Sequence, residues 1–111
     1  MVSEGVGFRE LDDVLAERGL KGSPYLEFLR VPSMSAGLYV LPAGGVDAQL
    51  PHKQDELYYV IRGKARMRAG LQDRAIGRGT LIFVAASVEH RFHRIEEELE
   101  ILVLFAPAET E

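Results

Sequence analysis

A histidine and a carboxylate stand four positions apart near the middle of this chain, at His52 and Glu56. Glu56 opens an alternating run that is typical of a β-strand, in which residues of like parity share one face. Glu56, Tyr58 and Val60 are therefore expected on the inward face. Because a buried carboxylate is costly unless it is paired or binds a cation, Glu56 should have a partner, and His52 is the nearest candidate ligand. The same spacing is common on surface helices and loops, so the pair alone leaves both interpretations open.

A third candidate, His90, lies in the segment GRGTLIFVAASVEHRFH, where a glycine-rich turn, an apolar strand and a small-residue loop precede it. Together the two segments resemble the cupin family, whose motifs read G-x5-H-x-H-x3-E-x6-G and G-x5-P-x-G-x2-H-x3-N. Every interval is kept. The first motif corresponds to Gly44, Leu50, His52, Glu56 and Gly63, and the second to Gly79, Ala85, Ser87, His90 and Arg94.

The chain departs from the family pattern at four of these positions. Leu50 stands where the family has its first metal-binding histidine, so one of four usual ligands is absent. Ala85, Ser87 and Arg94 replace the proline, glycine and asparagine of the second motif. The resemblance covers residues 38–107. Because cupins carry many unrelated activities, it implies a site and not a reaction.

The resemblance implies that His52, Glu56 and His90 bind a divalent metal ion. Two imidazoles and one carboxylate suit non-haem iron, and also zinc, manganese, nickel or cobalt. Three protein ligands leave positions for water or substrate, as in catalytic sites. Gln49 is a possible fourth ligand, although its strand parity would require a bulge to turn it inward.

Two further side chains near these ligands need an assignment. Tyr58 shares the inward face with Glu56, where it can either contact a bound ligand or fill the core. His93 shares its face with charged Arg91, so we expect it at the surface.

Two functions follow from the resemblance, and the sequence does not decide whether the chain is an enzyme. One is a metal-dependent, dioxygenase-like enzyme that acts on a small organic acid or an aromatic compound. The other is a non-catalytic cupin module that binds or senses a small molecule, as the missing first histidine would allow.

Short strands at regular spacing predict the elements that must position these residues. We expect an all-β fold, an antiparallel cupin barrel of jelly-roll type with six to eight strands and a short N-terminal helix. The helix is predicted over residues 8–18, with Phe8 and Val14 on its apolar side and Gly19 as its end. Glycine turns are expected at Gly63, Gly70, Gly77 and Gly79. The strands are predicted over residues 25–31, 36–41, 56–61, 65–69, 74–76, 80–84, 90–95 and 99–105.

The length of 111 residues predicts a single cupin domain over residues 1–111. Within it, residues 1–24 form the helix and lead-in, residues 25–107 the barrel, and residues 108–111 a frayed polar tail. Lys64, Arg66 and Arg68 alternate with small or apolar residues and are expected on a solvated face.

Composition and charge bear on the partners and the cellular location of the protein. The net charge of −4 argues against nucleic-acid binding, and no apolar segment is long enough to span a bilayer. The chain has no cysteine and no signal-peptide pattern at its start, so we expect a cytoplasmic protein. Leu57, Tyr59 and Ile61 form an outward apolar stripe, which predicts a homodimer. No catalytic triad, phosphate loop or dinucleotide fingerprint is present.

Overall fold

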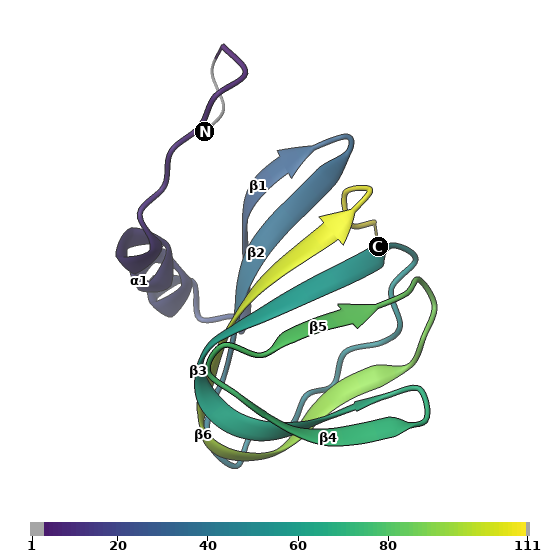
Figure 1. Ribbon diagram of the computed structural model, residues 1–111. Helices are drawn as coiled ribbons and strands as arrows, with labels where there is room; N and C mark the ends of the chain where they lie inside the picture. Colours follow the sequence, from purple (N-terminus) through teal and green to yellow (C-terminus); the bar gives the residue numbers. More distant parts are fainter. Residues whose placement is uncertain (1–3, 111) are drawn as a thin grey trace.

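The computed structural model describes residues 4–110. Its fold is built on two long antiparallel strands, β3 (Asp55–Ala69) and β6 (His90–Ala106), which pair along most of their length. Both strands bend, so that each takes part in two facing layers (Figure 1). The sheet order is β1-β2-β6-β3-β4, with β5 also paired to β3. This is the mostly antiparallel fold with one short N-terminal helix that we expected from the sequence.

The remaining elements extend the two layers. β1 (Tyr25–Val31) and β2 (Met34–Leu41) form a hairpin that joins the second half of β6. β5 (Leu81–Val84) pairs with the first half of β3, whereas β4 (Gln72–Gly77) pairs with its second half. The helix α1 (Leu11–Lys21) contacts β1 and β2. No helix among residues 4–110 is long and apolar enough to cross a membrane.

Gly63 bends β3 and does not end it. The predicted turn at this residue is wrong, because the strand runs through it with irregular pairing on both sides. Gly63 has a φ of 108°, and a Cβ atom there would lie 2.4 Å from the carbonyl oxygen of Glu98. Glycine therefore allows a bulge that brings β3 close to β6. The two strands predicted over residues 90–95 and 99–105 are likewise one bent strand, β6.

Strand parity was predicted correctly where it matters for the site. Glu56, Tyr58 and Val60 are buried inside the barrel. In the second half of β3, Ala65 and Met67 are also buried, while the alternating basic residues lie on the outside. The core between the layers is completed by apolar side chains of β6, among them Phe92, Ile101, Val103 and Phe105.

The helix begins and ends three residues later than predicted. Glu10 is the N-cap in an extended conformation, and its carbonyl oxygen accepts the N–H groups of Asp13 and Val14. Gly19 lies inside the helix, which ends at Gly22 with a φ of 75°. Phe8 is 88% exposed, and Val14 is the buried residue of the helix. The error arose because Gly19 and Gly22 can each end a helix, and only Gly22 has the left-handed backbone conformation that does so.

Residues 107–110 are held against the barrel, so the predicted fraying of the tail is wrong for this described part. The N–H of Glu109 donates to Ser35 Oγ at 2.9 Å, and Gln54 Nε2 donates to Thr110 Oγ1 at 2.7 Å. The Arg30 guanidinium donates to the carbonyl oxygen of Glu109. These contacts come from β1, β2 and the segment before β3, and they place the Glu109 side chain at one end of the barrel.

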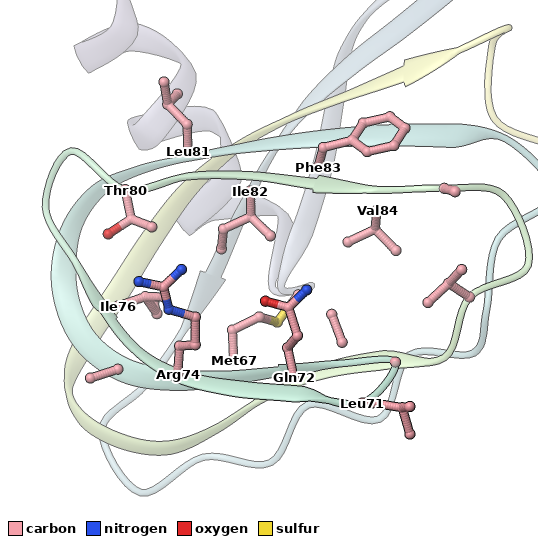
Figure 2. Close-up of a pocket in the computed structure, with 15 residues that line it drawn as sticks. Met67, Leu71, Gln72, Arg74, Ile76, Thr80, Leu81, Ile82, Phe83 and Val84 are labelled. Carbon is pink, nitrogen blue, oxygen red and sulfur yellow. The ribbon is translucent and has the colours of Figure 1, made fainter.

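The strands β4 and β5 do not pair with each other, and they border a hollow of about 730 Å³ (Figure 2). Ile82, Val84 and Met67 point into this hollow, whereas Leu81 and Phe83 point away from it. Its lining contains no histidine, aspartate or glutamate. The candidate metal ligands therefore gather outside this hollow.

Candidate metal centre

The structure brings His52, Glu56 and His90 together from three segments. His52 lies in the irregular segment before β3, Glu56 is the second residue of β3, and His90 is the first residue of β6. One potential ligand atom from each lies within 4.8 Å of the others. Glu56 is 2% exposed and His90 6%. These three residues can hold a metal ion.

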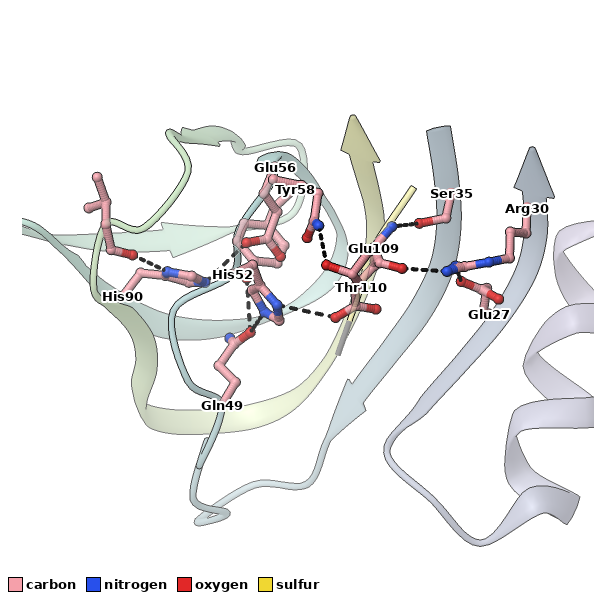
Figure 3. A network of polar contacts seen from close by, with 12 residues as sticks. Glu27, Arg30, Ser35, Gln49, His52, Glu56, Tyr58, His90, Glu109 and Thr110 are labelled. Carbon is pink, nitrogen blue, oxygen red and sulfur yellow. Dashed lines mark hydrogen bonds and ion pairs between the residues drawn. The ribbon is translucent and has the colours of Figure 1, made fainter. Parts of the chain in front are cut away.

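The orientation of His90 leaves one ring nitrogen free to bind a cation. Its Nδ1 is 2.8 Å from the carbonyl oxygen of Val88 (Figure 3). Because a carbonyl only accepts, Nδ1 carries the hydrogen, and in the neutral ring Nε2 carries a lone pair. Nε2 is 3.1 Å from Glu56 Oε1, yet both buried atoms lack a hydrogen-bond partner. Two buried acceptors that face each other at this distance are satisfied by a cation between them.

The electrostatics at His90 agree with a cation site. Burial alone would lower the pKa of His90, but the nearby Glu56 carboxylate and the Val88 carbonyl raise it above its usual value. The surroundings of the ring therefore favour positive charge at this point.

His52 has a similar arrangement of its two ring nitrogens. Its Nδ1 is 3.1 Å from Glu109 Oε2, and its Nε2 is 3.1 Å from Gln49 Oε1. The carboxylate accepts the hydrogen on Nδ1, so the neutral ring presents a lone pair at Nε2 towards the amide oxygen of Gln49. A hydrogen bond from a metal-binding histidine to a carboxylate fixes the tautomer and the orientation of the ring. Glu109 had no sequence signal, since it reaches the site only through the docked tail.

Gln49 faces the site with its amide oxygen. Its Nε2 donates to Asp47 Oδ2 at 2.8 Å, and its Oε1 accepts from the hydroxyl of Tyr58 at 3.2 Å. The parity objection to Gln49 does not apply, because residues 42–54 form no strand. The neighbouring Leu50 is 77% exposed. Gln49 thus lies beside the ligand cluster, while the position of the missing family histidine points to solvent.

Asp47 supports this arrangement and was missed from the sequence, where it belongs to no motif. It is buried, and it accepts hydrogen bonds from the Tyr39 hydroxyl at 2.6 Å and from the N–H of Phe92 at 2.9 Å. Burial and the bond to Asp47 raise the pKa of Tyr39 above its usual value. Burial and the charge of Glu56 do the same for the pKa of Tyr58. Both hydroxyls therefore stay protonated as donors.

His93 and Asp55, which are close to the ligands in the sequence, lie outside the cluster. His93 faces outwards, with Nε2 3.1 Å from Asp73 Oδ1. Asp55, next to Glu56, accepts the N–H of Ala86 at 2.9 Å and so ties the loop after β5 to β3.

A cavity of about 150 Å³ adjoins the cluster. Its lining is mainly aromatic and acidic, and it includes Glu109 from the tail. The full lining is Tyr25, Tyr39, Gln49, His52, Glu56, Tyr58, Val103, Phe105 and Glu109.

The fold and the cluster define a small antiparallel barrel protein with a His/Glu/His cluster that could hold a metal ion. The chain belongs to the cupin family, since the Cupin domain model matches residues 37–106. A protein of Streptomyces coelicolor, the uncharacterized protein SCO3923, is 46% identical over 100 residues, which are 90% of this chain and 95% of that protein.

Solved structures show the same fold at low sequence identity. TT1209 of Thermus thermophilus is 20% identical with a TM-score of 0.76, over 93% of this chain and 99% of the other. KdgF of a Halomonas species is 19% identical with a TM-score of 0.68, over 75% of this chain and 76% of the other.

Proposed function

We propose that this cupin binds one divalent metal ion through His52, Glu56, His90 and Gln49 and acts on a small molecule in the adjacent cavity. The observation that carries the proposal is the pair of buried acceptors, Glu56 Oε1 and His90 Nε2, which face each other without a hydrogen bond. Beside them, His52 Nε2 lies 3.1 Å from Gln49 Oε1, an oxygen that also accepts from the Tyr58 hydroxyl. A metal ion coordinated by these atoms satisfies all four.

The protein groups around the ligands have distinct parts in this proposal. Val88 and Glu109 hold the two imidazoles with Nε2 towards the ion, and Asp47 holds the Gln49 amide with its oxygen inward. Aromatic side chains form much of the wall of the cavity next to these ligands, where a small molecule would bind. When bound, the metal ion supplies Lewis acidity or, if it is iron, oxygen chemistry.

The proposal extends to dioxygenase-like turnover, because two histidines and one carboxylate are the ligands of non-haem iron oxygenases. In such a reaction both oxygen atoms enter the organic product, so no external reductant is needed. The test is oxygen consumption by the iron-loaded protein with a panel of small organic acids, amines and aromatic compounds. Oxygen uptake that depends on both iron and substrate supports an enzyme.

Metal binding is tested first and separately. Protein stripped with a chelator and reloaded should hold about one divalent ion per chain by elemental analysis. Wild-type protein that retains no divalent ion would refute the proposal. Metal binding and small-molecule binding without turnover of any compound would instead identify a sensing or binding module.

A further inference from the structure

The cavity beside the candidate metal centre has an unusual charge balance. Its lining contains two carboxylates, Glu56 and Glu109, and no lysine or arginine. A third carboxylate, Asp47, lies directly behind Tyr39 and Gln49. One divalent ion would not neutralise three carboxylates. A carboxylate ligand would therefore meet no lysine or arginine side chain in the cavity, and it would approach a site of net negative charge.

The hydroxyl groups of Tyr39 and Tyr58 also disfavour a carboxylate ligand. Tyr39 donates its hydrogen to Asp47, and Tyr58 donates to Gln49. Both hydroxyls thus offer only lone pairs to a ligand. Glu109 uses one carboxylate oxygen on His52 and keeps the other as an acceptor. Apart from the Tyr25 hydroxyl, which has no partner, these polar groups offer acceptors to the cavity, and acceptors suit a ligand that is a cation or a hydrogen-bond donor.

Aromatic rings form the rest of the wall. Tyr25 and Tyr39 meet edge to face with ring centroids 6.2 Å apart, and Phe105 lies 4.8 Å from the His52 ring. Tyr25 reaches this place because residue 37 is glycine, at which a Cβ atom would lie 2.1 Å from the Tyr25 hydroxyl oxygen. That hydroxyl is buried and has no hydrogen-bond partner. Aromatic faces together with carboxylates are the groups that recognise organic ammonium ions.

We propose that this cavity takes a small organic cation of the ammonium class, in preference to a carboxylate. The proposal rests on the proposed function for the ion beside the cavity, and it narrows the class of small molecule. A quaternary ammonium head fits the walls without any need to coordinate the metal. It differs from the organic acid expected from the sequence, because the cavity presents no lysine or arginine side chain to an acid.

The test compares three ligands of one shape on zinc-loaded protein by isothermal titration calorimetry. They are choline, the neutral alcohol in which a tert-butyl group replaces the trimethylammonium group, and the carboxylate that carries the same tert-butyl group. Choline should bind about tenfold more tightly than the neutral alcohol, and the carboxylate more weakly than either. A carboxylate that binds as tightly as choline, or no binding of choline, overturns the proposal.

Variants separate the aromatic wall from the metal. Tyr25→Leu should lose the preference for choline, while Tyr25→Phe keeps the ring and should retain it. Phe8→Leu, which removes an aromatic ring that is 88% exposed, is the matched control and should behave as wild type. If circular dichroism shows that Tyr25→Leu does not fold, Gly37→Ala is used in its place, because the added Cβ displaces the same ring. Equal loss in Tyr25→Phe and Tyr25→Leu would contradict a role of the ring.

The metal content of each sample is measured independently by elemental analysis. Choline selectivity in protein that binds no metal would leave the cavity proposal standing and remove the proposed function. Normal metal content without choline selectivity would overturn the cavity proposal and leave the proposed metal binding standing.

Discussion

At the scale of single residues, two histidines three positions apart on β6 have opposite environments. His90 points inward to Glu56, whereas His93 points outward to Asp73. His90→Ala should therefore remove stoichiometric metal, because it deletes a ligand from the cluster. His93→Ala should leave metal content nearly unchanged and is the matched control. Elemental analysis after identical loading checks this, and equal loss in the two variants would contradict the assignment.

Glu109 offers a second test at this scale. Because its carboxylate fixes the ring of His52, Glu109→Gln should weaken metal binding by about 10- to 100-fold without removing a ligand. Glu27→Gln is the control, since Glu27 also contacts Arg30 but does not line the cavity. Competition with a chromogenic chelator measures the affinity. Unchanged affinity in Glu109→Gln would show that the tail does not support the site.

Residues of the site that belong to a sequence motif could be predicted, whereas residues held there by contacts between distant parts of the chain could not. His52, Glu56 and His90 stand at the spacings of the two cupin motifs, and the resemblance to that family implied that they meet. Asp47 and Glu109 could not be found in this way. Asp47 depends on bonds to Tyr39 and to the backbone of β6, and Glu109 depends on a tail that folds back on β2. Such long-range pairings leave no periodic pattern in the sequence.

At the scale of elements, glycine positions decide where strands bend and where the helix ends. Alternation predicted most strands, but Gly63 was read as a turn because bulges and turns need the same left-handed backbone. Gly63→Ala should be destabilising by about 1–3 kcal/mol or more, since its Cβ would clash with the backbone of Glu98 and Leu99. Gly19→Ala in α1 has open space and should be stabilising by about 0.5–1 kcal/mol. Urea denaturation distinguishes the two, and equal effects would contradict this account of the bulge.

Asp73 connects β4 to its neighbours on the outer face. Its Oδ1 lies 3.1 Å from Arg66 Nε on β3 and 3.1 Å from His93 Nε2 on β6. Partial desolvation alone would raise the pKa of Asp73, but the hydrogen bonds from His93 and Arg66 lower it below its usual value. A carboxyl with a lowered folded-state pKa adds stability above its unfolded pKa, and this stability is lost as pH falls through the folded pKa.

Asp73→Asn should therefore lower the urea midpoint near pH 7, and the difference from wild type should shrink as the pH falls below about 4. Glu96→Gln, which removes an exposed carboxylate from β6, is the control and should have little effect at either pH. A difference that grows as the pH falls would give the opposite sign and contradict the pairing.

At the scale of the whole molecule, four exposed apolar side chains lie together on one outer face of the barrel. Leu57 and Tyr59 of β3 pair in register with Phe83 and Leu81 of β5. All four side chains are exposed, Leu81 and Phe83 by 67% and 64%. Exposed apolar side chains that lie together usually mark an interface, because contact with a partner removes them from water. The homodimer expected from the outward stripe of β3 is therefore predicted to form here, with β5 as part of the interface.

A two-fold interface places the same residue on both copies, so one substitution acts twice. Phe83→Glu would bring two buried carboxylates into such an interface and should convert the dimer into a monomer. Leu20→Glu on α1, where the leucine is 90% exposed, is the matched control and should remain dimeric. Sedimentation velocity should give a species of twice the 12.3 kDa chain mass for wild type and for Leu20→Glu. Wild-type protein that sediments as a 12.3 kDa monomer at high concentration would show that this face serves another purpose.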